Sequence, residues 1–269
     1  ESLRQEGPDV ARIDLGRVAM ITVCLWDWNQ RYGIEHIATM RDMLSRRLSL
    51  PHEIVCITDR PKQIPAGIRT FDVKHTIGPQ DHKCQRRMWL YGGKPKAAGK
   101  PWPGDLGQRL LQLDLHVVLT DSIDPIVDRP DSFVIWKSDS TVKPNRPHGW
   151  AYNATVMLLD AGARRDVYDR WNADRRGISK LADRDGWDVK TCSDQAIATY
   201  LLKDNPPAVW TEADGIYGYR TFAGPDGMKD RGLPEGCRIV SFHGRSGARH
   251  PGAKELQERS PWIKEHWAA

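Results

Sequence analysis

The sequence predicts an α/β fold built around a mainly parallel β-sheet. Several apolar segments run without the alternation of a half-exposed strand, which is typical of parallel strands covered on both faces. Segments with helical periodicity separate some of them. A chain of 269 residues is long enough for one large α/β domain, and no shift in composition marks a second one. We therefore expect a single domain.

The first four elements follow in the order β-α-β-β. Residues 18–26 (VAMITVCLW) form a continuous apolar run, which indicates a buried strand. Residues 33–48 carry isoleucine, methionine and leucine at helical spacing and end before Pro51, so we expect an amphipathic helix there. Apolar runs at 53–58 and 68–73 predict the second and third strands.

The rest of the chain predicts more strands and three more helices, the first of them at 85–93. Residues 92–107 are crowded with glycine, proline and lysine, which predicts a surface loop that is either a lid or a disordered connector. An apolar strand is expected within residues 109–125, ending in the turn TDSIDP. Further strands are expected at 132–136, 151–162 and 237–244, and helices around 167–171 and at 193–202.

Composition excludes several other classes of protein. No apolar run approaches the roughly 18 residues that a membrane helix needs. The polar N-terminal segment lacks the apolar region of a secretory signal, so a cytoplasmic location is the default expectation. Five cysteines without a C-x-x-C pair indicate reduced structural thiols and no zinc cluster. A net charge of +5 permits an anionic substrate without requiring nucleic acid.

Two polar residues stand out in the apolar stretch 109–125. On a strand, Asp114 and His116 would share one face. An unpartnered buried carboxylate costs several kcal/mol, so we expect a cation beside Asp114. A metal ion would serve, and so would an arginine or backbone groups. The turn that follows indicates that the pair lies near the carboxyl end of its strand, where open α/β sheets bind ligands.

An ordered set of motifs resembles a known family. Residues 110–136 (LLQLDLHVVLTDSIDPIVDRPDSFVIW) are followed by YNATVMLLDAG at 152–162, SDQAIATYLL at 193–202 and IVSFHGR at 239–245. Together these resemble the GT-A nucleotide-sugar glycosyltransferases, especially bacterial relatives of glycosyltransferase family 8, over about residues 18–250. The resemblance implies a single-domain, Rossmann-like fold of the GT-A type, with a mixed, mainly parallel sheet flanked by helices.

The resemblance also implies an organisation and an activity. A polar segment at 1–17 would precede the catalytic domain at 18–250, and a C-terminal tail would follow at 251–269. Within the catalytic domain, the nucleotide-binding half would span about 18–120 and the acceptor half about 121–250. The implied reaction moves a sugar from a nucleotide-sugar donor, expected to be a UDP-sugar, to a hydroxyl of a saccharide, lipid or protein. The family resemblance implies retention of configuration.

A metal site follows from the same resemblance. In this family a D-x-D motif holds a divalent cation, usually manganese, against the donor diphosphate. Asp114 and His116 form a D-x-H variant here, and His243 in SFHGR matches the third ligand of the family. One carboxylate and two imidazoles suit Mn²⁺ or another first-row divalent cation better than Mg²⁺. Such a cation stabilises the charge that develops on a departing diphosphate.

The resemblance assigns further residues to the donor. Asp194 and Gln195 match a D-Q pair beside the anomeric carbon, although a helix N-terminus also favours an Asp. Asn153 matches an F-N-x-G segment that holds the donor sugar, and its NAT triplet is also a glycosylation sequon. The other assigned donor-binding residues are Asp59, which could equally serve a turn, and Arg86, chosen over its neighbour Arg87 as the basic residue that faces the diphosphate and sugar. Arg245 or Arg249 loosely matches a lysine position of the family.

Two other functions stay open at the level of sequence. The chain could glycosylate a hydroxymethylated pyrimidine base in DNA, because basic loops and tryptophans suit phosphate contacts and base stacking. It could also be a non-catalytic protein that binds nucleotide sugars or carbohydrates, since a fold does not guarantee an activity. The sequence does not indicate an oligomeric state.

Overall fold

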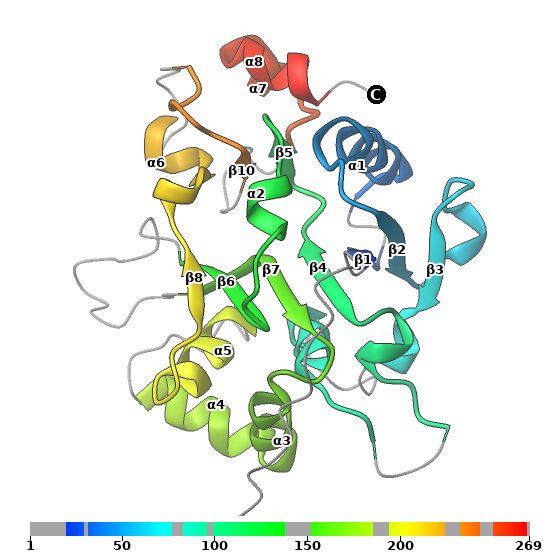
Figure 1. Cartoon of the computed structure of the whole chain (residues 1–269), viewed down its shortest axis with the longest axis vertical. Coiled ribbons are helices and arrows are strands. Elements are labelled where there is room, and N and C mark those ends of the chain that lie inside the picture. The colour runs from blue at the N-terminus through cyan, green and yellow to red at the C-terminus, as the bar shows by residue number, and fades with distance from the viewer. Residues whose placement is uncertain are drawn as a thin grey trace, which may run out of the picture.

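A computed structural model describes residues 20–29, 32–76, 83–95, 99–137, 152–184, 194–223, 232–242 and 250–267. Its main sheet contains β1 (Ile21–Asp27), β2 (His52–Thr58), β3 (Arg69–Asp72), β4 (Arg109–Leu113), β6 (Phe133–Lys137), β7 (Tyr152–Asp160) and β8 (Ala208–Trp210). The strands lie in the order β3-β2-β1-β4-β7-β6-β8 (Figure 1). The mixed α/β fold in one domain is the fold that the sequence predicts.

Pairing within the main sheet is parallel except around β7. β1 is parallel with both of its neighbours, β2 and β4, and β3 is parallel with β2. β7 is antiparallel to β4 and to β6, while β8 is parallel with β6. Because β7 runs against β4, the beginning of β7 lies beside the carboxyl end of β4. Polar residues at these two strand ends are thereby brought together.

The apolar stretch 109–125 is divided between two sheets. β4 ends at Leu113, and the chain leaves the main sheet to form β5 (Val117–Leu119), which pairs with β10 (Ile239–Ser241) beside β9 (Ile216–Gly218). The prediction that Asp114 and His116 lie on one strand is therefore wrong, because both belong to the connection between β4 and β5. The prediction that they stand at the carboxyl end of a strand is confirmed.

Helices and 3₁₀ turns cover both faces of the main sheet. On one face, α1 (Ile34–Arg47) contributes Met40 and Leu44 to an apolar cluster that includes Val23 and Leu25 of β1. On the other face, Cys24 of the same strand belongs to a second cluster. That cluster also draws on η3 (Lys83–Tyr91), α3 (Arg165–Ala173), α4 (Arg175–Arg184) and α5 (Asp194–Leu202). Alternate residues of β1 thus enter opposite layers.

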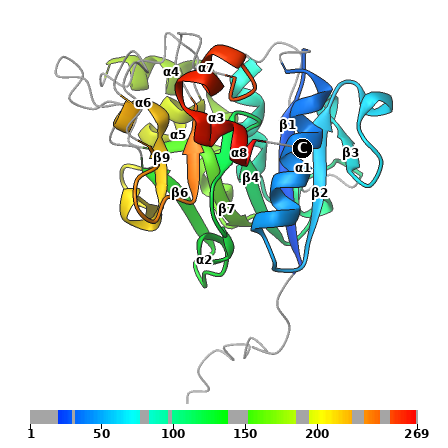
Figure 2. The ribbon, with the colours of Figure 1, turned by 90° about the horizontal axis from the view of Figure 1, so that it is seen from above.

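The segment predicted as a C-terminal tail packs on the domain in its described part. α7 (Lys254–Arg259) and α8 (Pro261–His266) bring buried apolar side chains into the cluster on the α1 face: Leu256, Trp262, Ile263 and Trp267. Figure 2 shows β1, β2, β3 and α1 at one end of the molecule, with β6, β9 and α6 (Tyr219–Ala223) at the other. In the part of the chain that the structure describes, no helix has the length and apolarity to cross a membrane.

Candidate active site

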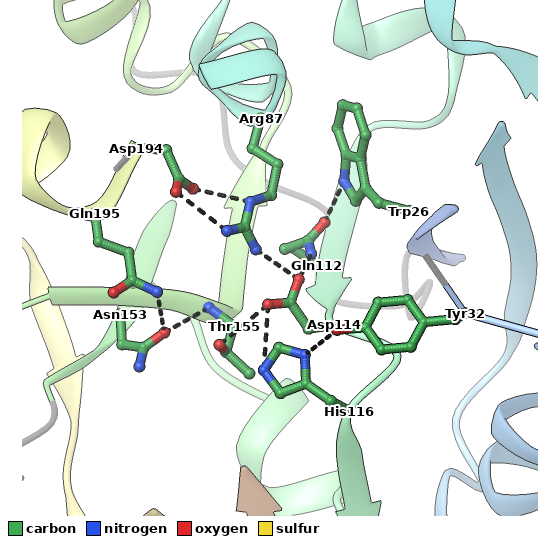
Figure 3. Close-up of polar contacts among 10 residues, drawn as sticks. All are labelled: Trp26, Tyr32, Arg87, Gln112, Asp114, His116, Asn153, Thr155, Asp194 and Gln195. Atoms are coloured by element: carbon green, nitrogen blue, oxygen red, sulfur yellow. Dashed lines mark hydrogen bonds and ion pairs between the residues drawn. The ribbon is translucent and has the colours of Figure 1, made fainter. Parts of the chain in front are cut away.

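Four elements meet at the carboxyl end of β4. Asp114 directly follows this strand, and Thr155 lies on the facing part of β7, where its backbone oxygen accepts a hydrogen bond from the Asp114 amide at 3.1 Å. α5 packs on β7 and η3 packs on α5. The first residue of α5 is Asp194, and η3 carries Arg87. Figure 3 shows these side chains converging from the four elements.

Arg87 joins the two carboxylates. Its Nη1 lies 2.5 Å from Oδ1 of Asp114, while its Nε and Nη2 lie 2.8 Å and 3.1 Å from the two oxygens of Asp194. The side chains of Arg87, Asp114 and Asp194 are only 9%, 12% and 3% exposed. Arg87 is thus the cation that Asp114 requires, and it comes from a segment 27 residues earlier in the chain.

The two carboxyl groups have opposite pKa shifts. Burial raises the pKa of Asp114, but the charges of Arg87 and His116 and the hydrogen bonds from Arg87 and Thr155 outweigh it, so this pKa lies below its ordinary value. Burial, reinforced by the charge of Asp114, holds the pKa of Asp194 above its ordinary value despite Arg87. One guanidinium faces two carboxylates, so the cluster has surplus negative charge when both are ionised. A further cation would be accommodated favourably beside it.

A polar network fixes Asp114 from the core side. Its Oδ1 also accepts a hydrogen bond from Nε2 of Gln112 at 3.2 Å, and its Oδ2 accepts one from the hydroxyl of Thr155 at 3.2 Å. Gln112 is held in turn by Nε1 of Trp26, which donates to its Oε1 at 2.6 Å. Gln112 and Thr155 are fully buried. Because each partner is itself bonded, the carboxylate has a fixed position before any ligand binds.

His116 faces the same carboxylate. Its Nε2 lies 3.6 Å from Oδ2 of Asp114, and its Nδ1 lies 3.2 Å from the hydroxyl of Tyr32. Two ligands of one ion, each at about 2.1 Å, can be no more than about 4.2 Å apart. The Asp114 and His116 atoms satisfy this limit, and a carboxylate oxygen with an imidazole nitrogen is a donor set that first-row cations accept. These two residues therefore fit a divalent cation.

The third predicted ligand lies outside the described residues. His243 belongs to that part of the chain, as do the predicted phosphate contacts Arg245 and Arg249. Within the described ranges, no group of three or more His, Cys, Asp or Glu side chains could hold a metal ion.

Asn153 and Gln195 are in direct contact. The Asn153 Oδ1 accepts hydrogen bonds from Nε2 of Gln195 at 2.8 Å and from the amide of Thr155 at 3.0 Å. These bonds identify which end of the Asn153 amide is the oxygen. The Nδ2 group is left as a buried donor with no hydrogen-bond partner among the described residues. A ligand oxygen at this point would satisfy it.

Two predicted donor-binding residues make their hydrogen bonds outside this cluster. Asp59, exposed after β2, accepts a hydrogen bond from the Asn29 amide at 3.0 Å. Arg86 is half-buried, and its Nη1 donates to the carbonyl of Val73 at 3.3 Å. Sequence reasoning chose Arg86 over its neighbour Arg87, which makes the contacts described above. Neighbouring residues of a 3₁₀ helix point about 120° apart, so only the packing of η3 decides between them.

Sequence reasoning also missed Gln112, Thr155 and Tyr32. A signal for the first two was available, because Gln112 precedes Asp114 by two residues and Thr155 follows Asn153 by two. Polar residues with this spacing on otherwise apolar strands emerge on one face. No comparable signal marks Tyr32, which is separated from His116 by 84 residues.

Comparisons with known proteins show which fold the chain has. No family model and no curated protein sequence matches the chain. The galactosyltransferase LgtC, solved with donor and acceptor sugar analogues, is similar in structure with a TM-score of 0.56 and 12% identity, over 92% of this chain and 97% of LgtC. The apo-form glycosyltransferase GlyE of Streptococcus pneumoniae TIGR4 is similar with a TM-score of 0.53 and 16% identity, over 92% of this chain. The match spans only 60% of GlyE. The chain therefore has the fold of the GT-A glycosyltransferases.

Proposed function

We propose that the chain is a glycosyltransferase that moves a sugar from a nucleotide-sugar donor, a UDP-sugar, to a hydroxyl acceptor with retention of configuration. The observation that carries the proposal is the enclosed cluster of Asp114, Arg87 and Asp194 at the carboxyl end of β4. The fold shared with LgtC, whose structure contains donor and acceptor sugar analogues, supports a sugar donor and a saccharide acceptor.

The proposed cofactor is Mn²⁺ or another divalent first-row cation. Asp114 and His116 would hold it, with His243 as the third ligand. When bound, the cation would supply positive charge for the diphosphate that leaves the sugar. The surplus negative charge of the Asp114, Arg87 and Asp194 cluster supports this proposal, because a divalent ion would neutralise it.

Asp194 is suited to stabilising charge in the proposed reaction. The bond between the anomeric carbon and the phosphate oxygen breaks, the acceptor oxygen bonds to that carbon, and the acceptor proton passes to the departing phosphate. A partial positive charge develops on the sugar. Asp194 is held by two nitrogen atoms of Arg87, which lowers its power as a nucleophile and favours an electrostatic role. Front-face displacement agrees with this arrangement.

Amide groups would orient the donor sugar. Asn153 has a buried Nδ2 donor without a hydrogen-bond partner among the described residues, and its contact with Gln195 makes the two amides one unit. A sugar hydroxyl that accepts from Nδ2 would satisfy a group that is costly to leave unbonded. Asp59, Arg86, Arg245 and Arg249 stay proposed contacts for the nucleotide and diphosphate.

A donor-hydrolysis assay tests the proposal. The wild-type protein should release UDP from at least one UDP-sugar when Mn²⁺ is present, and EDTA should abolish the release. His116→Ala should reduce both turnover and the dependence on Mn²⁺. Unchanged turnover in that variant would contradict the assignment of the cation site. Thermal stabilisation by UDP-sugars without any release would instead identify a binding protein that lacks catalysis.

A further inference from the structure

We propose that Tyr32 is a positioning residue that holds the His116 ring with Nε2 toward Asp114, an inference that rests on the proposed function. The Tyr32 hydroxyl lies 3.2 Å from Nδ1 of His116, which is the ring nitrogen that does not face the carboxylate (Figure 3). The two rings are stacked, with centroids 6.3 Å apart and planes at 25°. Nε2 then lies 3.6 Å from Oδ2 of Asp114.

A histidine that binds a metal ion needs a hydrogen bond to orient its ring more than a carboxylate ligand does. A carboxylate can bind a cation through either oxygen, whereas the Nε2 of imidazole offers a single lone pair in the ring plane. If the ring turned over about its bond to Cβ, a carbon atom would face the cation site. A hydrogen bond at Nδ1 prevents this rotation and selects which nitrogen is presented.

The Tyr32 hydroxyl can form a hydrogen bond with either tautomer of the neutral His116 ring. It can donate to Nδ1 when the ring proton is on Nε2, where that proton faces Asp114. It can also accept from Nδ1 when the proton is there, which leaves the Nε2 lone pair for a cation. Tyr32 can therefore keep the ring in one orientation before and after a cation binds, by rotating only its own O–H bond.

Tyr32 is itself fixed by contacts outside the site. Its carbonyl oxygen accepts a hydrogen bond from Nη2 of Arg60 at 2.6 Å. Arg60 forms a two-point ion pair with Asp27, at 2.7 Å and 3.0 Å, and the Asp27 side chain is fully buried. The Tyr32 ring packs against both His36 and His250, with centroid distances of 5.5 Å to each. Backbone and ring are thus both restrained.

Manganese binding tests the inference separately from turnover. Mn²⁺ would be titrated into the metal-free protein with saturating UDP, and the free ion would be followed by its electron paramagnetic resonance signal against a UDP-only blank. Tyr32→Phe removes only the hydroxyl and keeps the ring contacts. We expect its affinity for Mn²⁺ to fall about 10- to 100-fold, as for other residues that orient a ligand. The KM for Mn²⁺ should rise, with kcat recovered at high Mn²⁺.

Tyr200→Phe is the matched control, because it also removes only a tyrosine hydroxyl. Tyr200 lies toward the end of α5, and the substitution retains its ring, over which the Nζ of Lys203 lies at 4.3 Å. This variant should bind Mn²⁺ like the wild type, and His116→Ala should lose binding. Equal affinities of Tyr32→Phe and the wild type, with His116→Ala impaired, would overturn the role of Tyr32 while leaving the proposed function intact. Failure of the wild type to bind Mn²⁺ would overturn both.

Discussion

Replacing Arg87 by methionine tests the charge arrangement on which the site depends. The substitution keeps an unbranched apolar side chain but removes the cation that is ion-paired with Asp194 and that lies closest to Asp114 among the described residues. Removing one partner of a buried ion pair costs about 3–5 kcal/mol, because the other charge is left enclosed and unpaired. Arg87 is 9% exposed and bonds two carboxylates, so we expect the free energy of unfolding to fall by about that amount at pH 8.

The loss of unfolding free energy caused by Arg87→Met should become smaller as pH falls. Without Arg87, the pKa values of Asp114 and Asp194 should both lie above those of the unfolded chain, so the folded variant binds more protons than the unfolded one. Its stability then falls as pH rises and recovers as pH falls. In the wild type, Asp114 has a lowered pKa, so its contribution is lost only as pH falls through and below its ordinary pKa range, while Asp194 already has a raised pKa that the loss of Arg87 should raise further. The difference between the two proteins should therefore shrink as the pH falls from 8 to 4.

Urea unfolding followed by circular dichroism at both pH values measures the effect. Arg86→Met is the matched control, since Arg86 is the neighbouring residue of η3 and makes one backbone hydrogen bond at 3.3 Å. It should cost no more than about 1 kcal/mol at either pH. Similar losses for both variants, or a loss for Arg87→Met that does not change with pH, would refute the assignment of Arg87 as the shared counter-ion.

Two further substitutions test the amide pair and the C-terminal helices. Asn153→Ala should lower the free energy of unfolding by about 1–3 kcal/mol, because Gln195 and the Thr155 amide lose their acceptor. The variant should also be stabilised less by UDP-sugars. A thermal shift with UDP-sugars equal to that of the wild type would contradict this. Trp267→Ala should cost about 3–5 kcal/mol in urea unfolding, because the ring is 8% exposed and packs on His36 at 5.5 Å. A loss below about 1 kcal/mol would mean that the segment after residue 250 is not part of the cooperative core.

The elements of the main sheet could be predicted because their burial leaves a strong mark on the sequence. β1 is buried along its whole length and appears as one apolar run, and α1 has its apolar residues at helical spacing. The division of 109–125 into β4 and β5 could not be predicted in the same way. It depends on pairing with β10, whose residues lie more than a hundred positions later.

The site could be predicted in part for a similar reason. Asp114, His116, Asn153 and Asp194 are polar residues at the ends of apolar elements, and the structure brings them together. The choice between Arg86 and Arg87 depends on how η3 packs, which its own sequence does not encode. Tyr32 lies between β1 and α1, and its place beside His116 results from the tertiary fold.

Anomalous diffraction from crystals grown with Mn²⁺ and UDP would test the central claim most directly, since the claim is that remote side chains share one divalent cation. We predict one manganese peak within about 2.3 Å of an oxygen of Asp114 and of Nε2 of His116, with His243 as the third protein ligand. A manganese peak elsewhere, or UDP bound with no ion between Asp114 and His116, would contradict the account.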